Sequence, residues 1–207
     1  SGKIISNIQR KFKSKKVIVR NSAISEDGFN SSNAGAYVSV LDIDVTVKKA
    51  ILDSITSVID SYEDRNLANQ VLVQPMIENV RVSGVIFTRT LSESAPYYVI
   101  NFDDSSQETD TITSGSSSDH KTLVISRNNA VDLENAVPQA LRGLIPAIQE
   151  IENLLDFKAL DIEFSIGIDG EVHILQVRPL TSDKYEIDSD HVIFEAIEGC
   201  IAKFKSL

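Results

Sequence analysis

The sequence is poor in the features that mark secreted, membrane and nucleic-acid-binding proteins. It has one cysteine, Cys200, so no disulfide can form within the chain, which fits a reducing compartment. No apolar run reaches the roughly 18 residues of a membrane-spanning helix, and no apolar signal-peptide core lies near the start. Basic residues are outnumbered, giving a formal charge of −10, whereas a nucleic-acid-binding surface is basic. We therefore expect a cytoplasmic protein that holds any phosphate ligand by local charge.

An initiator methionine is also lacking. The chain opens with Ser1-Gly2, and its single methionine is Met76, which predicts an excised piece of a longer protein. Its 207 residues, 42% of them hydrophobic, can bury a core as one large domain or as two lobes.

Hydrophobic periodicity predicts alternating strands and helices. Strands are expected at residues 16–22, 71–77, 82–89, 97–102 and 121–127. Helices are expected from Asp44 to about Arg65, from Pro138 to about Leu155, and from Asp190 to near Lys205. Polar stretches at 25–35 and 103–120 are expected to be loops, and such long loops in a compact domain are usually functional or disordered.

Residues 161–178 predict a β-hairpin. Asp169-Gly170 lies between two alternating apolar runs, which is the strongest short-range signal for a hairpin with a two-residue loop. In that register the polar residues form two cross-strand pairs, Glu163 with Gln176 and Asp161 with Arg178, all on one face. The opposite, core face is expected to carry Ile162, Phe164, Ile166, Leu175 and Val177, with His173 among them as a structural residue.

The polar face of this hairpin has two interpretations. A carboxylate and an amide oxygen side by side, with a guanidinium one step along, suit magnesium and phosphate. The same pattern also fits a solvated polar face with a cross-strand Asp-Arg pair.

Two other segments combine a strand with polar or small residues. Arg20, at a strand end, and the small residues from Ser31 to Ala36 could hold phosphate oxygens, although Ser/Gly loops are common. The strand ending at Gln74-Pro75 could offer an exposed edge to adenine while Met76 packs on the ring. Taken by itself, the latter segment is better explained as a buried strand followed by a turn.

Taken in order, several segments resemble one family. They are VIVRNSA, SSNAGAYVSVLD, VLVQPMI, VSGVIFTR, a TSG loop, DIEFSI and ILQVRP, spread over residues 17 to about 181. Together they resemble the nucleotide-binding domain of phosphoenolpyruvate synthase and pyruvate phosphate dikinase, an ATP-grasp fold also found in rifampin phosphotransferases. The resemblance implies an α+β fold of mostly antiparallel sheets flanked by helices, with the domain at residues 1–183 and a helix at 184–207 leading to the next domain.

The resemblance also implies roles for individual residues. Arg20 matches the family arginine that touches the ATP phosphates, and Ser39 falls where the family has a threonine near them. The adenine-holding hinge strand is matched by Gln74, Met76 and Ile77. The magnesium-binding pair is matched by Glu163 and Gln176, and Arg178 matches the arginine thought to stabilise charge on the transferred phosphoryl group.

The chain departs from the family pattern in several places. The usual Arg-Ser-Ser is Arg20-Asn21-Ser22, and Ser-Phe-Ala-Gly-Gln is Ser32-Asn33-Ala34-Gly35-Ala36, which puts the lid contacts of that loop in doubt. No counterpart is found for the preceding subdomain with its glycine-rich segment and lysine, the swivelling histidine domain or the acceptor domain. We therefore expect this chain alone to bind ATP weakly and to turn nothing over.

For the whole protein, the resemblance implies splitting of ATP with magnesium and transfer of a phosphoryl group through a histidine on another domain. The acceptor would be pyruvate or another small metabolite such as glutamine, the latter as in the glutamine kinases of capsule phosphoramidate synthesis. Neither nucleic acid nor membrane is an expected partner. The alternatives are a degenerate, non-catalytic ATP-grasp module used for regulation or assembly and, with no support from the motif order, an ATP-grasp ligase.

Overall fold

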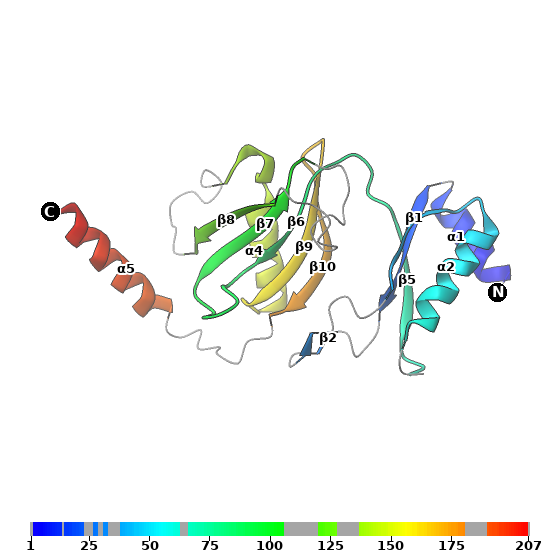
Figure 1. Ribbon diagram of the computed structural model, residues 1–207, viewed down its shortest axis with the longest axis horizontal. Coiled ribbons are helices and arrows are strands. Elements are labelled where there is room, and N and C mark those ends of the chain that lie inside the picture. Colours follow the sequence, from blue (N-terminus) through cyan, green and yellow to red (C-terminus); the bar gives the residue numbers. More distant parts are fainter. Residues whose placement is uncertain are drawn as a thin grey trace. The chain divides into compact units, whose positions relative to one another are not determined.

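The computed structural model describes residues 2–13, 15–22, 27–28, 31–32, 38–62, 66–105, 120–127, 137–180 and 190–206. It divides the chain into two units, residues 1–78 and 79–207, each with its own antiparallel sheet (Figure 1). The predicted α+β class with antiparallel sheets is therefore confirmed. Most of the two predicted polar loops lies outside the described residues. Within the described part, no helix is both long enough and apolar enough to cross a membrane.

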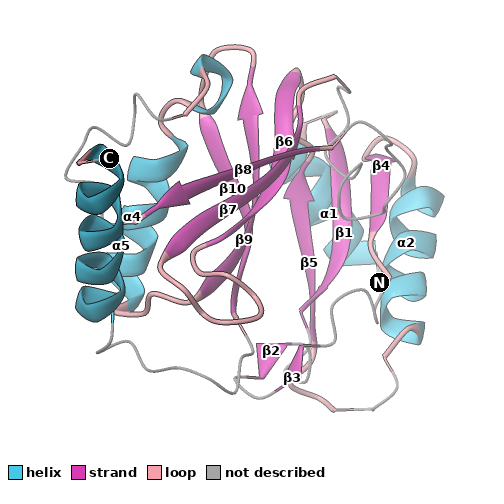
Figure 2. Ribbon diagram, turned by 60° about the vertical axis from the view of Figure 1, so that its left-hand side comes forward, coloured by secondary structure: helices cyan, strands magenta, loops and turns pink. Residues whose placement is uncertain are grey.

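The first unit is a three-stranded sheet with two helices on one face (Figure 1, Figure 2). Its elements are α1 (Gly2–Phe12), β1 (Lys16–Ser22), the short β2 (Asp27–Gly28) and β3 (Ser31–Ser32), β4 (Val40–Asp44), α2 (Lys48–Asp60) and β5 (Gln70–Pro75). The sheet order is β4-β1-β5, with antiparallel neighbours. Its core joins Val17 and Val19 of β1 to apolar side chains of both helices. The sequence reasoning missed α1, whose Ile5, Ile8 and Phe12 recur at helical spacing and are buried.

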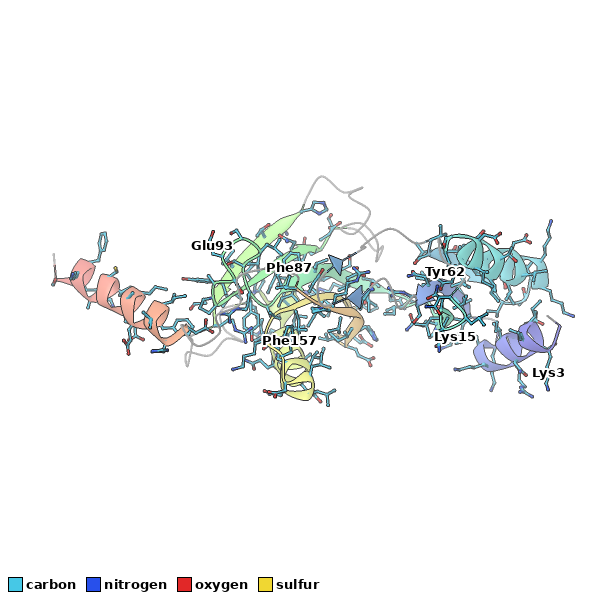
Figure 3. All side chains as sticks on the ribbon, turned by 90° about the horizontal axis from the view of Figure 1, so that it is seen from below. Lys3, Lys15, Tyr62, Phe87, Glu93 and Phe157 are labelled. Carbon is cyan, nitrogen blue, oxygen red and sulfur yellow. The ribbon has the colours of Figure 1, made fainter. Side chains whose placement is uncertain are left out.

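Tyr62, just after α2, forms hydrogen bonds with the sheet of the first unit and is labelled in Figure 3. Its hydroxyl accepts a hydrogen bond from the Ser22 amide at 3.2 Å and donates one to the Gln70 carbonyl. One side chain thus joins the end of β1 to the start of β5.

The predicted cap of α2 by Asp44 is wrong. The helix begins at Lys48 after Val47, with no side-chain cap, and ends at Asp60. Asp44 Oδ1 instead accepts hydrogen bonds from Thr46 N at 2.8 Å and Thr46 Oγ1 at 2.7 Å, a turn just before the helix. The Thr46 hydroxyl, the largest cause, lowers the pKa of Asp44 below its usual range.

The second unit is a five-stranded antiparallel sheet in the order β10-β9-β6-β7-β8, with a helix packed on one face (Figure 1). Its elements are β6 (Val80–Phe87), β7 (Tyr97–Asp103), β8 (Lys121–Ser126), the 3-10 turn η1 (Gln139–Leu141), α4 (Leu144–Leu155), β9 (Leu160–Gly167), β10 (Val172–Pro179) and α5 (Asp190–Lys205). Leu144, Ile145 and Ile148 of α4 pack against the sheet, as the periodicity predicts.

The helix predicted to open at Pro138 is interrupted. Residues 139–141 form η1, and α4 begins only after Gly143, whose φ of +83° is a left-handed conformation that favours glycine. The apolar pattern continues across this break because η1 also buries Leu141.

The β9–β10 hairpin pairs its polar residues as predicted, but for a different reason. Gln176 lies opposite Glu163 and Arg178 opposite Asp161. The loop is longer than expected, because Gly167 N bonds to Glu171 O and Gly170 N to Gly167 O, both at 3.0 Å. Residues 167–170 thus form a turn, and Gly170 has a left-handed backbone with φ +85°. This combination is typical of a three-residue hairpin loop, here residues 168–170. A register shift between Ile174 and Gln176 then restores the predicted pairing.

The same shift overturns part of the predicted core face. Val172 and Ile174 pack against the core, together with Ile162, Phe164, Ile166 and Val177. His173, between the first two, therefore lies on the polar face opposite Ser165 and is not a core residue. Leu175 is the extra residue at the shift.

Helix α5 begins where predicted, and its first residue is bound to the sheet of its unit. Arg89, 2% exposed, donates Nη1 to Asp190 Oδ2 at 2.9 Å and Nη2 to Asp190 Oδ1, and its Nε donates to Ser94 O at 2.7 Å. The Asp190 carboxylate therefore pairs with a buried arginine.

Candidate nucleotide and metal site

The strongest candidate site in the second unit is the polar face of the hairpin. Ile162 and Phe164 are completely buried on the core side, so Asp161 and Glu163 point to the other face. Arg178, 9% exposed, lies opposite Asp161, and its Nη1 is 3.6 Å from Glu163 Oε1. The carboxylate, amide and guanidinium predicted to share a face therefore do so, while their chemical roles stay predictions.

Asp161 is the residue whose importance the sequence reasoning understated. Its Oδ1 is buried with no hydrogen-bond partner. Burial raises the pKa of Asp161 to about 6, with Glu163 adding to the shift and Arg178 opposing it. An acceptor atom kept buried without a donor is costly and calls for a ligand or another explanation. The pairing register placed Asp161 in this row, but only the fold shows that its oxygen lacks a donor.

The donor set fits a magnesium ion bound together with a phosphate ligand. Glu163 supplies a carboxylate, Gln176 an amide oxygen, and Asp161 an unused carboxylate oxygen in the same row. Among the described residues, no three His, Cys, Asp or Glu side chains are grouped closely enough to hold a metal by themselves. Magnesium is commonly held by one or two carboxylates, with waters and substrate phosphates completing its coordination.

The buried Asp161 predicts a measurable pH dependence of stability. Because its folded pKa of about 6 exceeds the ordinary value of about 3.9, the folded state favours the protonated acid, and this stability is lost as pH rises through 6. We expect Asp161→Asn to stabilise the metal-free chain at pH 7 by about 1–2 kcal/mol, after a discount for partial exposure. At pH 4 the two proteins should be similar.

Urea unfolding at both pH values, with chelator present, measures this difference. Glu171→Gln, at an exposed position of the same hairpin, is the matched control and should not alter the pH dependence. Equal stabilities of Asp161→Asn and wild type at pH 7 would contradict the burial argument.

The first unit gathers the residues expected to contact ATP. Val17, Val19, Val71 and Val73 face the helices. Arg20 and Gln74 therefore point to the opposite face, where they lie opposite Leu72 and Ile18 of the neighbouring strand. Ser39 is exposed and directly precedes β4, whose Val40 pairs with Val19, so it lies beside Arg20 across the strands.

The backbone at the end of β5 determines which polar groups face outward. Met76 N donates to Lys16 O at 2.9 Å, so the main-chain groups of Met76 point toward β1. In an antiparallel ladder the neighbouring residues point the other way. Since β5 is the terminal strand of its described sheet and ends at Pro75, the Pro75 carbonyl faces its outer edge.

The comparisons with known proteins bear on these residues. Residues 2–103 match the family model described as pyruvate phosphate dikinase, AMP/ATP-binding domain. The matched range includes Arg20, Ser39, Gln74, Met76 and Ile77. The hairpin lies beyond the matched range.

No curated protein matches the sequence. A solved structure of D-alanyl-alanine synthetase A from Vibrio cholerae O1 biovar eltor str. N16961 is similar at 15% identity and a TM-score of 0.43. The match covers 90% of this chain and 49% of that one, so the chain spans about half the length of that structure.

Proposed function

We propose that this chain is the ATP-binding part of an ATP-grasp phosphotransferase that splits ATP with magnesium. The observation that carries the proposal is the row of Asp161, Glu163, Gln176 and Arg178 on one face, in a chain whose residues 2–103 match an AMP/ATP-binding family model. A buried arginine and a carboxylate oxygen without a donor are costly, and a module without phosphate chemistry has no need of them.

We assign a role to each candidate residue. The Pro75 carbonyl and Ile77 amide would bind the edge of the adenine, with Met76 and Gln74 beside it, while Arg20 and Ser39 would contact phosphates. Glu163 and Gln176, joined by Asp161, would hold magnesium, which neutralises phosphate charge when bound. Arg178 would stabilise negative charge that develops on the transferred phosphoryl group.

The wider reaction follows from the family resemblance. The phosphoryl group would pass to a histidine on another domain of the same protein and then to a small acceptor, either pyruvate or a metabolite such as glutamine. We also propose that the protein works in the cytoplasm, where ATP is supplied.

Metal-dependent nucleotide binding tests the proposal. Titration calorimetry with a non-hydrolysable ATP analogue should show heat of binding that is strengthened by magnesium. Loss of one charge-assisted contact costs about 1.5–3 kcal/mol, so Glu163→Gln should weaken the magnesium-dependent binding by roughly one to two decades.

Glu171→Gln makes the same chemical change at an exposed position of the hairpin and should bind as wild type does. Equal affinities with and without magnesium in the wild-type chain would reject the metal site. Unchanged metal dependence in Glu163→Gln would remove that residue from it.

A further inference from the structure

Thr88 holds the start of the strand that carries Asp161 and Glu163. It follows β6 and is completely buried. Its amide donates to Leu160 O at 2.9 Å, and its Oγ1 accepts from Leu160 N at 2.8 Å and donates to Lys158 O at 3.0 Å. One residue therefore binds both main-chain polar groups of Leu160, the first residue of β9.

A buried ion pair holds Thr88 in turn. Arg127 Nη1 donates to Thr88 O at 2.8 Å and to Glu152 Oε1 at 2.6 Å, and its Nη2 donates to Glu152 Oε2 at 3.1 Å. The guanidinium lies 4.5 Å from the centre of the Tyr98 ring, and the Tyr98 hydroxyl donates to Glu152 Oε2 at 3.1 Å. These contacts thus connect the ends of β6 and β8 with the start of β7 and with the helix α4.

This network lies directly beside the charged end of the candidate site. Leu160 is followed by Asp161, which pairs with Arg178. The other strand is fixed at the same end, because Leu180 N donates to Ala159 O at 2.8 Å. A shift of the Leu160 backbone would therefore move Asp161 and, through the strand, Glu163.

We propose that Thr88 is a positioning residue for the metal and phosphate site, acting through Leu160 to set Asp161 against Arg178 and locked in place by Arg127 and Glu152. This inference rests on the proposed function, but it assigns a role to residues that lie outside the row of ligands. A purely structural network would stabilise the unit without affecting metal binding.

Two substitutions at the same position separate the hydroxyl from the bulk of the side chain. Thr88→Val keeps the shape and loses both Oγ1 hydrogen bonds, whereas Thr88→Ser keeps the hydroxyl and loses a buried methyl. The affinity of the full chain for Mn²⁺ in the presence of a non-hydrolysable ATP analogue is measured by electron paramagnetic resonance. We expect Thr88→Val to lose about tenfold or more in Mn²⁺ affinity, as for other residues that orient metal ligands, and Thr88→Ser to stay within about twofold of wild type.

Ile148→Val, which removes a methylene from the core under the same sheet, controls for loss of stability and should not change Mn²⁺ affinity. Equal Mn²⁺ affinities for Thr88→Val and wild type, or an equal loss in Thr88→Ser, would overturn the proposal. If Thr88→Val does not fold, Arg127→Lys takes its place. A lysine lacks the planar guanidinium that binds Glu152 and Thr88 together, so we expect the same loss of Mn²⁺ affinity.

A wild-type chain without Mn²⁺-dependent binding would instead reject the proposed function. The positioning role is then decided by crystal structures of the two Thr88 variants. Displacement of Asp161 from Arg178 in Thr88→Val alone supports it, and an unchanged pair overturns it.

Discussion

Under the proposed function, replacing Arg178 by lysine is expected to lower the rate of ATP cleavage by the phosphotransferase about a thousandfold with little change in fold. The guanidinium is almost buried, pairs across the strands with Asp161, and lies 3.6 Å from Glu163. A lysine ammonium keeps the charge but lacks the planar fork that can contact a carboxylate and a phosphoryl oxygen together. Single-turnover cleavage of ATP measures the chemical step apart from substrate binding.

Arg81→Lys is the matched control for this substitution. Arg81 lies on β6 of the same sheet and is exposed, so the exchange should leave the cleavage rate unchanged. Circular dichroism and thermal unfolding of both variants report whether the fold is kept. An Arg178→Lys protein that cleaves ATP within about twofold of the wild-type rate would remove Arg178 from the proposed mechanism.

The hairpin illustrates what sequence patterns can and cannot predict. Alternation and the Asp169-Gly170 turn gave the correct pairing of Glu163 with Gln176. The predicted loop was one residue too short, and an unpredicted extra residue at Leu175 restored the register. A slip of one residue exchanges the faces of a strand. Strict alternation from a two-residue loop therefore places His173 in the core, whereas it lies on the polar face opposite Ser165.

Long-range polar contacts escaped the sequence reasoning for a different reason. Arg127 and Glu152 are 25 residues apart, and Arg89 and Asp190 are 101 apart, so no periodicity relates them. These contacts depend on how segments far apart in the sequence pack together. The unused oxygen of Asp161 likewise becomes visible only when every potential donor around it has been placed. Segment order and strand alternation therefore predicted the candidate ligands but not the residues that hold them.

The buried pair of Arg127 and Glu152 predicts the largest change in stability. Their side chains are 12% and 5% exposed, and the carboxylate also accepts a hydrogen bond from Tyr98, whose pKa burial raises to about 12. Glu152→Gln keeps the shape but leaves the guanidinium without its counter-charge. Removing one member of a buried ion pair costs about 3–5 kcal/mol, so we expect a loss near the lower end of that range because Arg127 keeps its contacts with Thr88 O and the Tyr98 ring.

Urea unfolding of the single and double variants decides whether this cost comes from the unpaired charge. Arg127→Met combined with Glu152→Gln should be less destabilised than the sum of the two single variants, because the double variant buries no unpaired charge. At the other end of β8, Lys121 binds Asp104 at 2.7 Å with side chains 57% and 31% exposed, and Lys121→Met should cost less than about 1 kcal/mol. If Glu152→Gln costs no more than Lys121→Met, or if the two single effects simply add, the pair does not hold this end of the sheet together, and the positioning role inferred for Thr88 loses its support from Arg127.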